Sequence, residues 1–371
     1  MDVLARAHAL EAAGRRVLHL EIGEPDFTAP APVVEAGMRA LRDGRTAYTA
    51  TLGLLSLREQ IAAFYRSRFS VEVPASRIAI TSGASGGLLT VAALYVGPGD
   101  EILVPDPGYP GYRHFVRAFE GKARALPLSP ADDFQPTAAM IEKAWGRRTK
   151  GVLLGSPSNP TGTLISAAEL ARIARLVAKR RGVLIVDEIY QGLVYGADPS
   201  TALGLPGEVV VVNSFSKYFC MTGWRLGWVV LPPRAVRGFE KLAQHLFISA
   251  PSAAQHAALA AFLPESLAIL EQRRSEFARR RDFLVPELKR AGLAIPAEPR
   301  GAFYVYADCG GDARRWCLRL LEKETVAATP GIDFGANRTR RFVRFAYTRA
   351  MADLEEAAAR IRRFAGGAPS A

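Results

Sequence analysis

The sequence is poor in cysteine and has no long apolar run. Its three cysteines, Cys220, Cys309 and Cys317, form no CxxC pair, so neither a disulfide framework nor a zinc site is expected. No apolar stretch approaches the roughly 20 residues needed to cross a bilayer, and the first residues lack the layout of a signal peptide. We therefore expect a cytoplasmic protein that contacts no membrane and binds no metal.

The sequence has an excess of basic residues, with a formal net charge of +12, and the densest basic stretch lies at residues 273–281. Such a stretch could bind nucleic acid. Acidic and apolar residues interrupt it, however, and no nucleic-acid-binding motif accompanies it. We predict a solvated helix face and no nucleic-acid partner, although a basic surface could attract anionic substrates.

Apolar runs of four to six residues alternate with longer segments of helical period, which is typical of a parallel sheet with crossover helices. The runs that predict buried strands are residues 78–81, 101–104, 151–154, 183–186, 209–213 and 226–231. The predicted fold class is therefore α/β.

The pattern changes near Pro264, where a long charged helix is expected. Two further strands and a last amphipathic helix are predicted at 303–306, 341–345 and from Met351. We predict a large domain at 31–262, and a smaller α+β domain formed by 1–30 together with 263–371.

A lysine after a predicted strand is the first candidate for chemistry. Residues 214–217 read Ser-Phe-Ser-Lys, and Arg225 comes eight residues after Lys217. A lone lysine in such a place is usually a solvated surface residue. Here two hydroxyls and an arginine accompany it, and these are the donors that a phosphate monoester needs.

Ser-Phe-Ser-Lys, followed by Gly-Trp-Arg-Leu-Gly at 223–227, resembles the lysine signature of the class I and II pyridoxal-phosphate aminotransferases of fold type I. The resemblance covers nearly the whole chain. It implies a mainly parallel seven-stranded sheet, pyridoxal 5′-phosphate as cofactor, and ping-pong transfer of an amino group between an L-amino acid and a 2-oxo acid. It also implies that Lys217 forms the internal aldimine and then moves a proton between the substrate Cα and the cofactor C4′, with Ser214 and Arg225 at the phosphate.

A carboxylate ends the strand predicted at 183–186, which places Asp187 at the edge of a parallel sheet where ligands bind. Taken alone, Asp187 could be a helix N-cap or a surface acid, and Asn159 in Asn-Pro-Thr-Gly could simply form a tight turn. The resemblance implies that Asp187 keeps the pyridine nitrogen protonated. It implies that Tyr190 and Asn159 donate hydrogen bonds to the phenolic oxygen of the cofactor.

Residues 81–87 lie between a predicted strand and a predicted helix, so their backbone N–H groups should form an anion site. The resemblance places the cofactor phosphate on the backbone amides of Gly83, Ala84 and Ser85.

The same stretch matches Gly-x-Ser-x-Gly, the nucleophile elbow of α/β-hydrolases. Asp187 and then His245 or His256 would give the required chain order. We disfavour a hydrolase because His256 lies in a predicted helix and no HGGG-type loop is present.

Two tyrosines are further candidates for cofactor contacts. Tyr109 lies in the Pro/Gly-rich loop 105–112, where it could simply pack in a rigid turn, but the resemblance implies that it stacks on the pyridine ring. Tyr48 matches a family tyrosine that reaches the phosphate of the neighbouring subunit. This implies a homodimer with shared active sites.

Residues 341–346 alternate arginine with apolar side chains, and we expect both Arg341 and Arg344 on one face of a strand. The resemblance implies that Arg344, rather than Arg341, clamps the substrate α-carboxylate, with Asn159 beside it. Gly23 lets the backbone approach the same carboxylate.

Two alternatives remain open. A carbon–sulfur β-lyase of the same fold would release pyruvate and ammonia from a cysteine-type donor without any oxo-acid acceptor. A ligand-sensing regulator of this fold would usually carry an added DNA-binding domain. No motif fixes the side-chain specificity.

Overall fold

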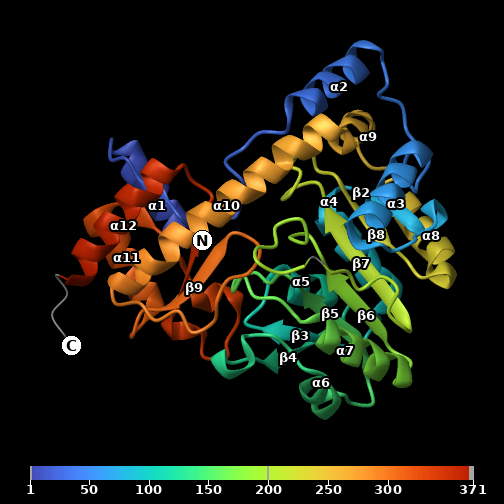
Figure 1. The fold of residues 1–371 in the computed structure, drawn as a ribbon. Coiled ribbons are helices and arrows are strands. Elements are labelled where there is room, and N and C mark those ends of the chain that lie inside the picture. The colour runs from blue at the N-terminus through green and yellow to red at the C-terminus, as the bar shows by residue number, and fades with distance from the viewer. Residues whose placement is uncertain (1, 199, 367–371) are drawn as a thin grey trace.

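The computed structural model describes residues 2–198 and 200–366. Seven strands form one sheet in the spatial order β2-β8-β7-β6-β5-β3-β4 (Figure 1). Their bounds are β2 (Ile78–Thr81), β3 (Glu101–Asp106), β4 (Lys122–Pro127), β5 (Thr149–Gly155), β6 (Val183–Asp187), β7 (Glu208–Ser214) and β8 (Gly227–Val230). Neighbouring strands from β7 to β4 are parallel, and β8 is antiparallel to both of its neighbours. The predicted α/β class with a mainly parallel seven-stranded sheet is confirmed.

Strand β4 is the member of this sheet that no apolar run predicted. It reads Lys-Ala-Arg-Ala-Leu-Pro, and Leu126 alone among its side chains is buried. The strand lies at the edge of the sheet and pairs only with β3. An edge strand with one covered side needs no continuous apolar run, so its sequence resembles a loop.

Helices cover both faces of the sheet. The helices that precede, connect and follow its strands in the chain are α2 (Ala31–Arg42), α3 (Leu55–Phe69), α4 (Gly83–Tyr95), α5 (Gly111–Arg117), α6 (Ala138–Ala144), α7 (Ala167–Lys179), α8 (Val236–Leu246) and α9 (Ser252–Leu259). Successive residues of a strand point to opposite faces. Along β6, Leu184 and Val186 join the apolar cluster that contains Ile173 of α7, whereas Val183 and Ile185 join the cluster formed by α4, α5 and α8. Burial on both faces explains why the central strands read as continuous apolar runs.

A second group of elements comes mostly from the C-terminal part of the chain. Its members are α1 (Asp2–Ala12), β1 (Leu18–His19), α10 (Pro264–Arg290), β9 (Tyr304–Asp308), α11 (Ala313–Glu324), β10 (Val326–Ala327), β11 (Thr329–Pro330), β12 (Phe342–Ala346) and α12 (Met351–Gly366). Strands β11, β12 and β9 form an antiparallel sheet, and β1 pairs in parallel with β10. Figure 1 shows α10 running from α9 toward α11 and α12. The N-terminal segment therefore pairs with the C-terminal part, as the domain prediction requires, while the boundaries at 30/31 and 262/263 stay a prediction.

The basic stretch on α10 is only partly the solvated face that the sequence predicted. Arg279 is 60% exposed, but the side chain of Arg280 is only 4% exposed. Its Nη1 donates to Asp26 Oδ1 at 2.7 Å and its Nε donates to Glu276 Oε1 at 2.9 Å. Arg280 therefore joins α10 to the N-terminal segment through a buried ion pair, a contact that periodicity cannot predict.

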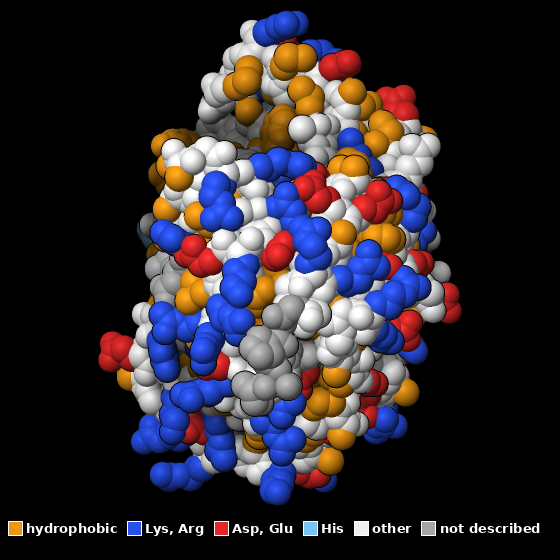
Figure 2. All heavy atoms as spheres, turned by 90° about the vertical axis from the view of Figure 1, so that its left-hand side faces the viewer, with side chains coloured by type: hydrophobic (Ala, Val, Ile, Leu, Met, Phe, Trp, Pro, Cys, Tyr) orange, Lys and Arg blue, Asp and Glu red, His pale blue; other side chains and the backbone are white. Residues whose placement is uncertain are grey.

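Figure 2 shows Lys and Arg side chains spread over one face of the molecule, with Asp and Glu among them. Arginines of α1 and α12 form ion pairs with acidic residues of α11, as between Arg6 and Glu322 or Arg363 and Glu324. In the described residues no single helix is long and apolar enough to span a membrane; one bent pair, 252–262 with Pro264–Arg290, passes by length and composition alone.

Replacing Arg280 should destabilise the protein far more than replacing its neighbour. Arg280→Ala leaves Asp26 and Glu276 without their buried partner, and we expect a loss of about 2–4 kcal/mol of unfolding free energy. Arg279→Ala removes an exposed pair and should change stability by about 0.5 kcal/mol or less. Urea unfolding of the two apoproteins measures both values, and equal effects would contradict the buried pairing.

Candidate active site

A cavity of about 560 Å³ opens at the edge where β5, β6 and β7 end. Its wall contains all the predicted site residues except Gly83 and Tyr48, namely Gly23, Ala84, Ser85, Tyr109, Asn159, Asp187, Tyr190, Ser214, Lys217, Arg225 and Arg344. The parallel pairing of these strands explains the convergence. Gly155, the last residue of β5, pairs with Asp187, the last residue of β6, so the segments that follow both strands meet at one edge.

Lys217 follows β7 and points its amine into this cavity. The Nζ atom donates to the carbonyl oxygen of Gly23 at 2.7 Å and lies 6.0 Å from the ring centre of Tyr190. Burial removes the ammonium from water and lowers the pKa of Lys217 from 10.5 to about 8. Arg344 and Arg225 also lower this pKa, while Glu24 opposes them. The amine is therefore far easier to deprotonate than that of a surface lysine.

Asp187 supplies a buried carboxylate to the same cavity. The hydroxyl of Tyr112 donates to its Oδ2 at 2.9 Å, and the backbone N–H of Ile189 donates to its Oδ1 at 3.2 Å. Burial raises the pKa of Asp187 to about 6, while these two hydrogen bonds and Lys217 oppose the rise. Asp187 thus stays mainly ionised at neutral pH and is oriented by a tyrosine that the motif analysis did not assign.

Arg225 and the first turn of α4 form one end of the cavity. Gly83 begins α4 with φ +72°, and a Cβ built on it would lie 2.6 Å from Nη2 of Arg225. Only glycine therefore lets the helix start and the guanidinium approach so closely. Ser214 adds a hydroxyl that lies 2.9 Å from the Oγ of Ser216. A helix N-terminus, hydroxyls and an arginine together form a site for a dianion.

Arg344 on β12 forms another part of the wall. Its Nη1 donates to Asn159 Oδ1 at 3.0 Å, and its Nη2 donates to the carbonyl oxygen of Glu21 at 2.6 Å. The guanidinium carbon lies 4.3 Å from the ring centre of Tyr304 and 4.8 Å from that of Phe334. The Nε atom is buried and has no hydrogen-bond partner. An unpartnered donor on a fixed guanidinium fits a carboxylate that arrives with a ligand.

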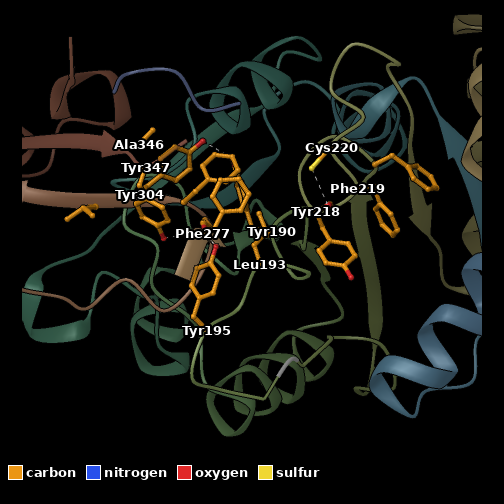
Figure 3. Packing of buried hydrophobic residues seen from close by; sticks show 14 of the residues in the cluster. Tyr190, Leu193, Tyr195, Tyr218, Phe219, Cys220, Phe277, Tyr304, Ala346 and Tyr347 are labelled. Atoms are coloured by element: carbon orange, nitrogen blue, oxygen red, sulfur yellow. Dashed lines mark hydrogen bonds between the residues drawn. The ribbon is translucent and has the colours of Figure 1, made fainter. Parts of the chain in front are cut away.

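Tyr190 and Tyr304 form an aromatic pair beside this arginine (Figure 3). Their hydroxyl oxygens lie 2.8 Å apart, and their rings meet edge to face at 5.7 Å. A Cβ on Gly23 would lie 2.2 Å from the Tyr304 hydroxyl, so glycine is required there for space. Tyr304, in the string Gly-Ala-Phe-Tyr on β9, was missed by the sequence analysis. The one indication of Tyr304 in the sequence was that an aromatic residue lies in the strand predicted at 303–306, which belongs to the same predicted small domain as the strand that carries Arg344.

The other two predicted tyrosines lie in different settings. Tyr109 is 36% exposed at the mouth of the cavity, and its ring meets that of Tyr112 edge to face at 5.4 Å. Tyr48 is 78% exposed and does not line the cavity of its own chain. This position is compatible with the prediction that it serves a neighbouring subunit.

The prediction that Arg341 and Arg344 share one face of a strand is wrong. Arg341 precedes β12, is 62% exposed, and pairs with Asp308 at 3.1 Å, whereas Arg344 faces the cavity. Residues three apart on an extended chain point to opposite sides. Arg344 lines the cavity and Arg341 does not, which supports the assignment of the substrate carboxylate to Arg344.

The hydrolase alternative needs a histidine in the cavity that Ser85 lines, and one of its two candidates, His245, is exposed on α8. Among the described residues that line the cavity there is no histidine, and His256 lies on α9 beside another hollow with Arg39 and Arg45. Without a base at Ser85, the elbow pattern marks the start of a helix and not a nucleophile.

Comparison with known proteins identifies the family. The family model "Aminotransferase class I and II" matches residues 15–361. The chain belongs to this family. The (5-formylfuran-3-yl)methyl phosphate transaminase of Methanocaldococcus jannaschii is 37% identical, over 98% of this chain and 95% of its own. The valine–pyruvate aminotransferase of Mycobacterium tuberculosis is 38% identical over 97% and 94%. A crystal structure of an aminotransferase from the same organism superposes with a TM-score of 0.95 at 38% identity, covering 99% of this chain and 96% of that one.

This aminotransferase therefore has the fold type I architecture, moves amino groups between amino acids and 2-oxo acids, and depends on pyridoxal phosphate as its family does. The cavity fits that cofactor on three observations. A glycine keeps the start of α4 open beside Arg225, a buried carboxylate at the end of β6 lines the cavity, and a lysine amine of lowered pKa lines the same cavity.

The lowered pKa of Lys217 predicts how the apoprotein takes up its cofactor. The neutral amine is the form that attacks an aldehyde, and its fraction at pH 7 is about 300 times larger with a pKa of about 8 than with 10.5. The rate of pyridoxal phosphate uptake, followed by visible absorbance, should rise about tenfold per pH unit up to about pH 8 and then level off.

The Glu24→Gln variant supplies a control for this pH profile. Glu24 raises the pKa of Lys217, so its removal should move the midpoint of the profile to lower pH. A midpoint near 10.5 in the unmodified protein would mean that the amine is not shielded from water.

Proposed function

We propose that this aminotransferase carries its cofactor on Lys217 and uses the same amine to move the proton at the substrate Cα. The observation that carries this proposal is the position of the Lys217 amine, which points into a cavity shared with the Asp187 carboxylate and with the unpartnered Nε of Arg344. When bound, pyridoxal phosphate supplies an aldehyde that exchanges amines and a ring that accepts the electrons released at Cα. Every other part of the reaction is assigned to residues of this chain.

The phosphate would lie against the start of α4, held by the backbone of Gly83, Ala84 and Ser85 and by the side chains of Ser214 and Arg225. These groups supply N–H donors, a hydroxyl and a guanidinium in one corner of the cavity. The positive end of the α4 dipole favours a dianion in the same place.

Asp187 would face the ring nitrogen and keep its proton in place. Tyr112 and the N–H of Ile189 orient this carboxylate, and its ionised form is the one that attracts a protonated ring. Tyr109 lies at the mouth, where an aromatic ring can stack on the cofactor.

Tyr190 and Asn159 would donate to the phenolic oxygen of the cofactor. Burial raises the pKa of Tyr190, so its hydroxyl remains a donor. The Oδ1 atom of Asn159 accepts from Arg344, which turns the amide nitrogen of the same side chain away from the guanidinium and leaves it for the cofactor.

The substrate carboxylate would bind at Arg344, with Asn159 and the backbone of Gly23 beside it. One side-chain acceptor, one backbone acceptor and two aromatic rings hold the guanidinium of Arg344 in place. Little side-chain freedom of Arg344 is therefore lost when the carboxylate binds. The Cα–H bond is then held near the amine of Lys217, which can accept that proton and return it.

We infer further that the active unit is a homodimer, in which Tyr48 reaches the phosphate of the neighbouring site. Large apolar side chains are exposed on the described surface of α2 and at the end of α8, among them Met38, Leu41 and Leu246, and such patches are typical of interfaces. Light scattering on the holoenzyme should give twice the 40.1 kDa of one chain. A stable, fully active species with the mass of one chain would refute the shared site.

The assignment of Lys217 is tested by a pair of lysine variants. Lys217→Ala should lose the visible band of the bound cofactor and at least about 10²–10⁴ in the rate of amino transfer, since the base is removed. Lys289→Ala, on the exposed face of α10, should keep both. Unchanged activity in Lys217→Ala would remove Lys217 from this role.

The same assay separates transamination from the lyase alternative. With an amino donor and a 2-oxo acid, each molecule of new amino acid should appear together with one molecule of new oxo acid, and omission of the acceptor should stop turnover. Continued release of pyruvate and ammonia from a cysteine-type donor without an acceptor would instead favour the β-lyase.

A further inference from the structure

Few charged side chains line the active-site cavity. In the described part of the chain, its cations are Lys217, Arg225 and Arg344, and its carboxylates are Asp187 and Glu24. An amino acid bound there brings one carboxylate at Cα, and aspartate or glutamate would bring a second one on the side chain. The number of uncommitted cations therefore decides whether a dicarboxylic substrate finds a partner for both groups.

None of the three cations is free for a second carboxylate. Arg225 lies against the start of α4, where Gly83 makes room for it, and Lys217 is the proposed anchor. Arg344 already donates to Asn159 and to the Glu21 carbonyl, so its Nε edge can bind one carboxylate only.

The wall next to Arg344 is aromatic and aliphatic. The ring of Tyr304 stacks against the guanidinium, and its hydroxyl is already paired with that of Tyr190. Ile22, next to Gly23, is an aliphatic member of the same lining. These groups offer contact area to an apolar side chain and no charge to an ionised one.

The remaining charged group on this side has the wrong sign for a second carboxylate. Glu24 follows Gly23 and accepts a hydrogen bond from the hydroxyl of Thr222. Its charge reaches Lys217, because it raises the pKa of that lysine. A substrate side-chain carboxylate in this region would meet a like charge without a compensating cation.

The neighbouring subunit, as proposed, would add an uncharged segment. The proposed donor of that contact is Tyr48, and residues 46–57 around it contain no Asp, Glu, Lys or Arg. Leu55, in the same segment, is apolar and exposed. The stretch that surrounds Tyr48 therefore brings no charge, and the cation that precedes it, Arg45, forms an ion pair with Asp43 at 3.8 Å.

We infer that this aminotransferase takes amino donors with uncharged, mainly apolar side chains and discriminates against dicarboxylic amino acids. The inference rests on the proposed function of Lys217 and Arg344 and adds the substrate class to it. Selection arises from the absence, in the described lining, of a cation for a second carboxylate and from the negative charge of Glu24.

The test uses donor pairs that differ in charge but hardly in shape. Purified holoenzyme is mixed in single turnover with glutamine or glutamate, with asparagine or aspartate, and with leucine, methionine and phenylalanine. The change in cofactor absorbance reports amine donation for each compound without any acceptor. We expect the apolar donors to react fastest. The rate constant divided by the dissociation constant should be about 10²-fold or more higher for each amide than for the corresponding acid.

The Glu24→Gln variant tests the cause of the discrimination. Removal of its charge should narrow the glutamine-to-glutamate ratio about tenfold, because any effect of the variant on Lys217 is common to both donors and cancels in the ratio. Glu355→Gln, exposed on α12, is the matched control and should leave the ratio unchanged.

The outcomes separate the two levels of the proposal. If no donor changes the cofactor absorbance, the proposed roles of Lys217 and Arg344 fail. If apolar donors react but glutamate equals or exceeds glutamine, those roles stand and the inferred substrate class is overturned, because a cation must then enter from the second subunit. An unchanged ratio in Glu24→Gln would also overturn the assigned cause.

Discussion

The parallel pairing of β5, β6 and β7 is the constraint on which the active site depends. Parallel strands end at the same edge, so the segments after Gly155, Asp187 and Ser214 meet there whatever the rest of the chain does. Each segment then contributes a different chemistry: an amide at Asn159, a carboxylate at Asp187 and an amine at Lys217. The second group of elements closes this edge with Arg344 on β12 and Gly23 on the N-terminal segment.

Burial gives these groups their reactivity. Removal from water lowers the pKa of the Lys217 amine and raises that of the Asp187 carboxylate. The two pKa values therefore approach neutral pH from opposite sides. A cofactor that brings both a cationic ring and an anionic phosphate satisfies the carboxylate at one end and the arginine at the other. The charges of the side chains that line the cavity and those of the cofactor are therefore complementary.

Much of this could be predicted from sequence because it is local. Several parts of the site can be recognised from a few neighbouring residues of the sequence. They are the strand that ends in Asp187, the lysine with two hydroxyls and a following arginine, and the glycines at 83 and 23. The sheet was predictable for the same reason, since strands buried on both faces read as apolar runs. The polar edge strand β4 left no such run and was missed.

What could not be predicted depends on contacts between distant segments. Tyr112 orients Asp187 from 75 residues away, and Tyr304 meets Tyr190 from 114 residues away. Nothing in the local sequence of either tyrosine marks these contacts. Arg280 resembles its exposed neighbours in sequence, but the N-terminal segment covers it and supplies Asp26. The shared-face prediction for Arg341 failed for a local reason, because residues three apart on an extended chain point to opposite sides.

The hydrogen bond from Lys217 to the carbonyl of Gly23 links the sheet to the N-terminal segment. That segment also pairs through β1 with β10 and so is attached to the C-terminal elements. Lys217 therefore has a second place in the fold besides the role proposed for it, because its side chain joins the end of β7 to the segment that carries Gly23. A substitution at this position alters the wall of the cavity and removes that link at the same time.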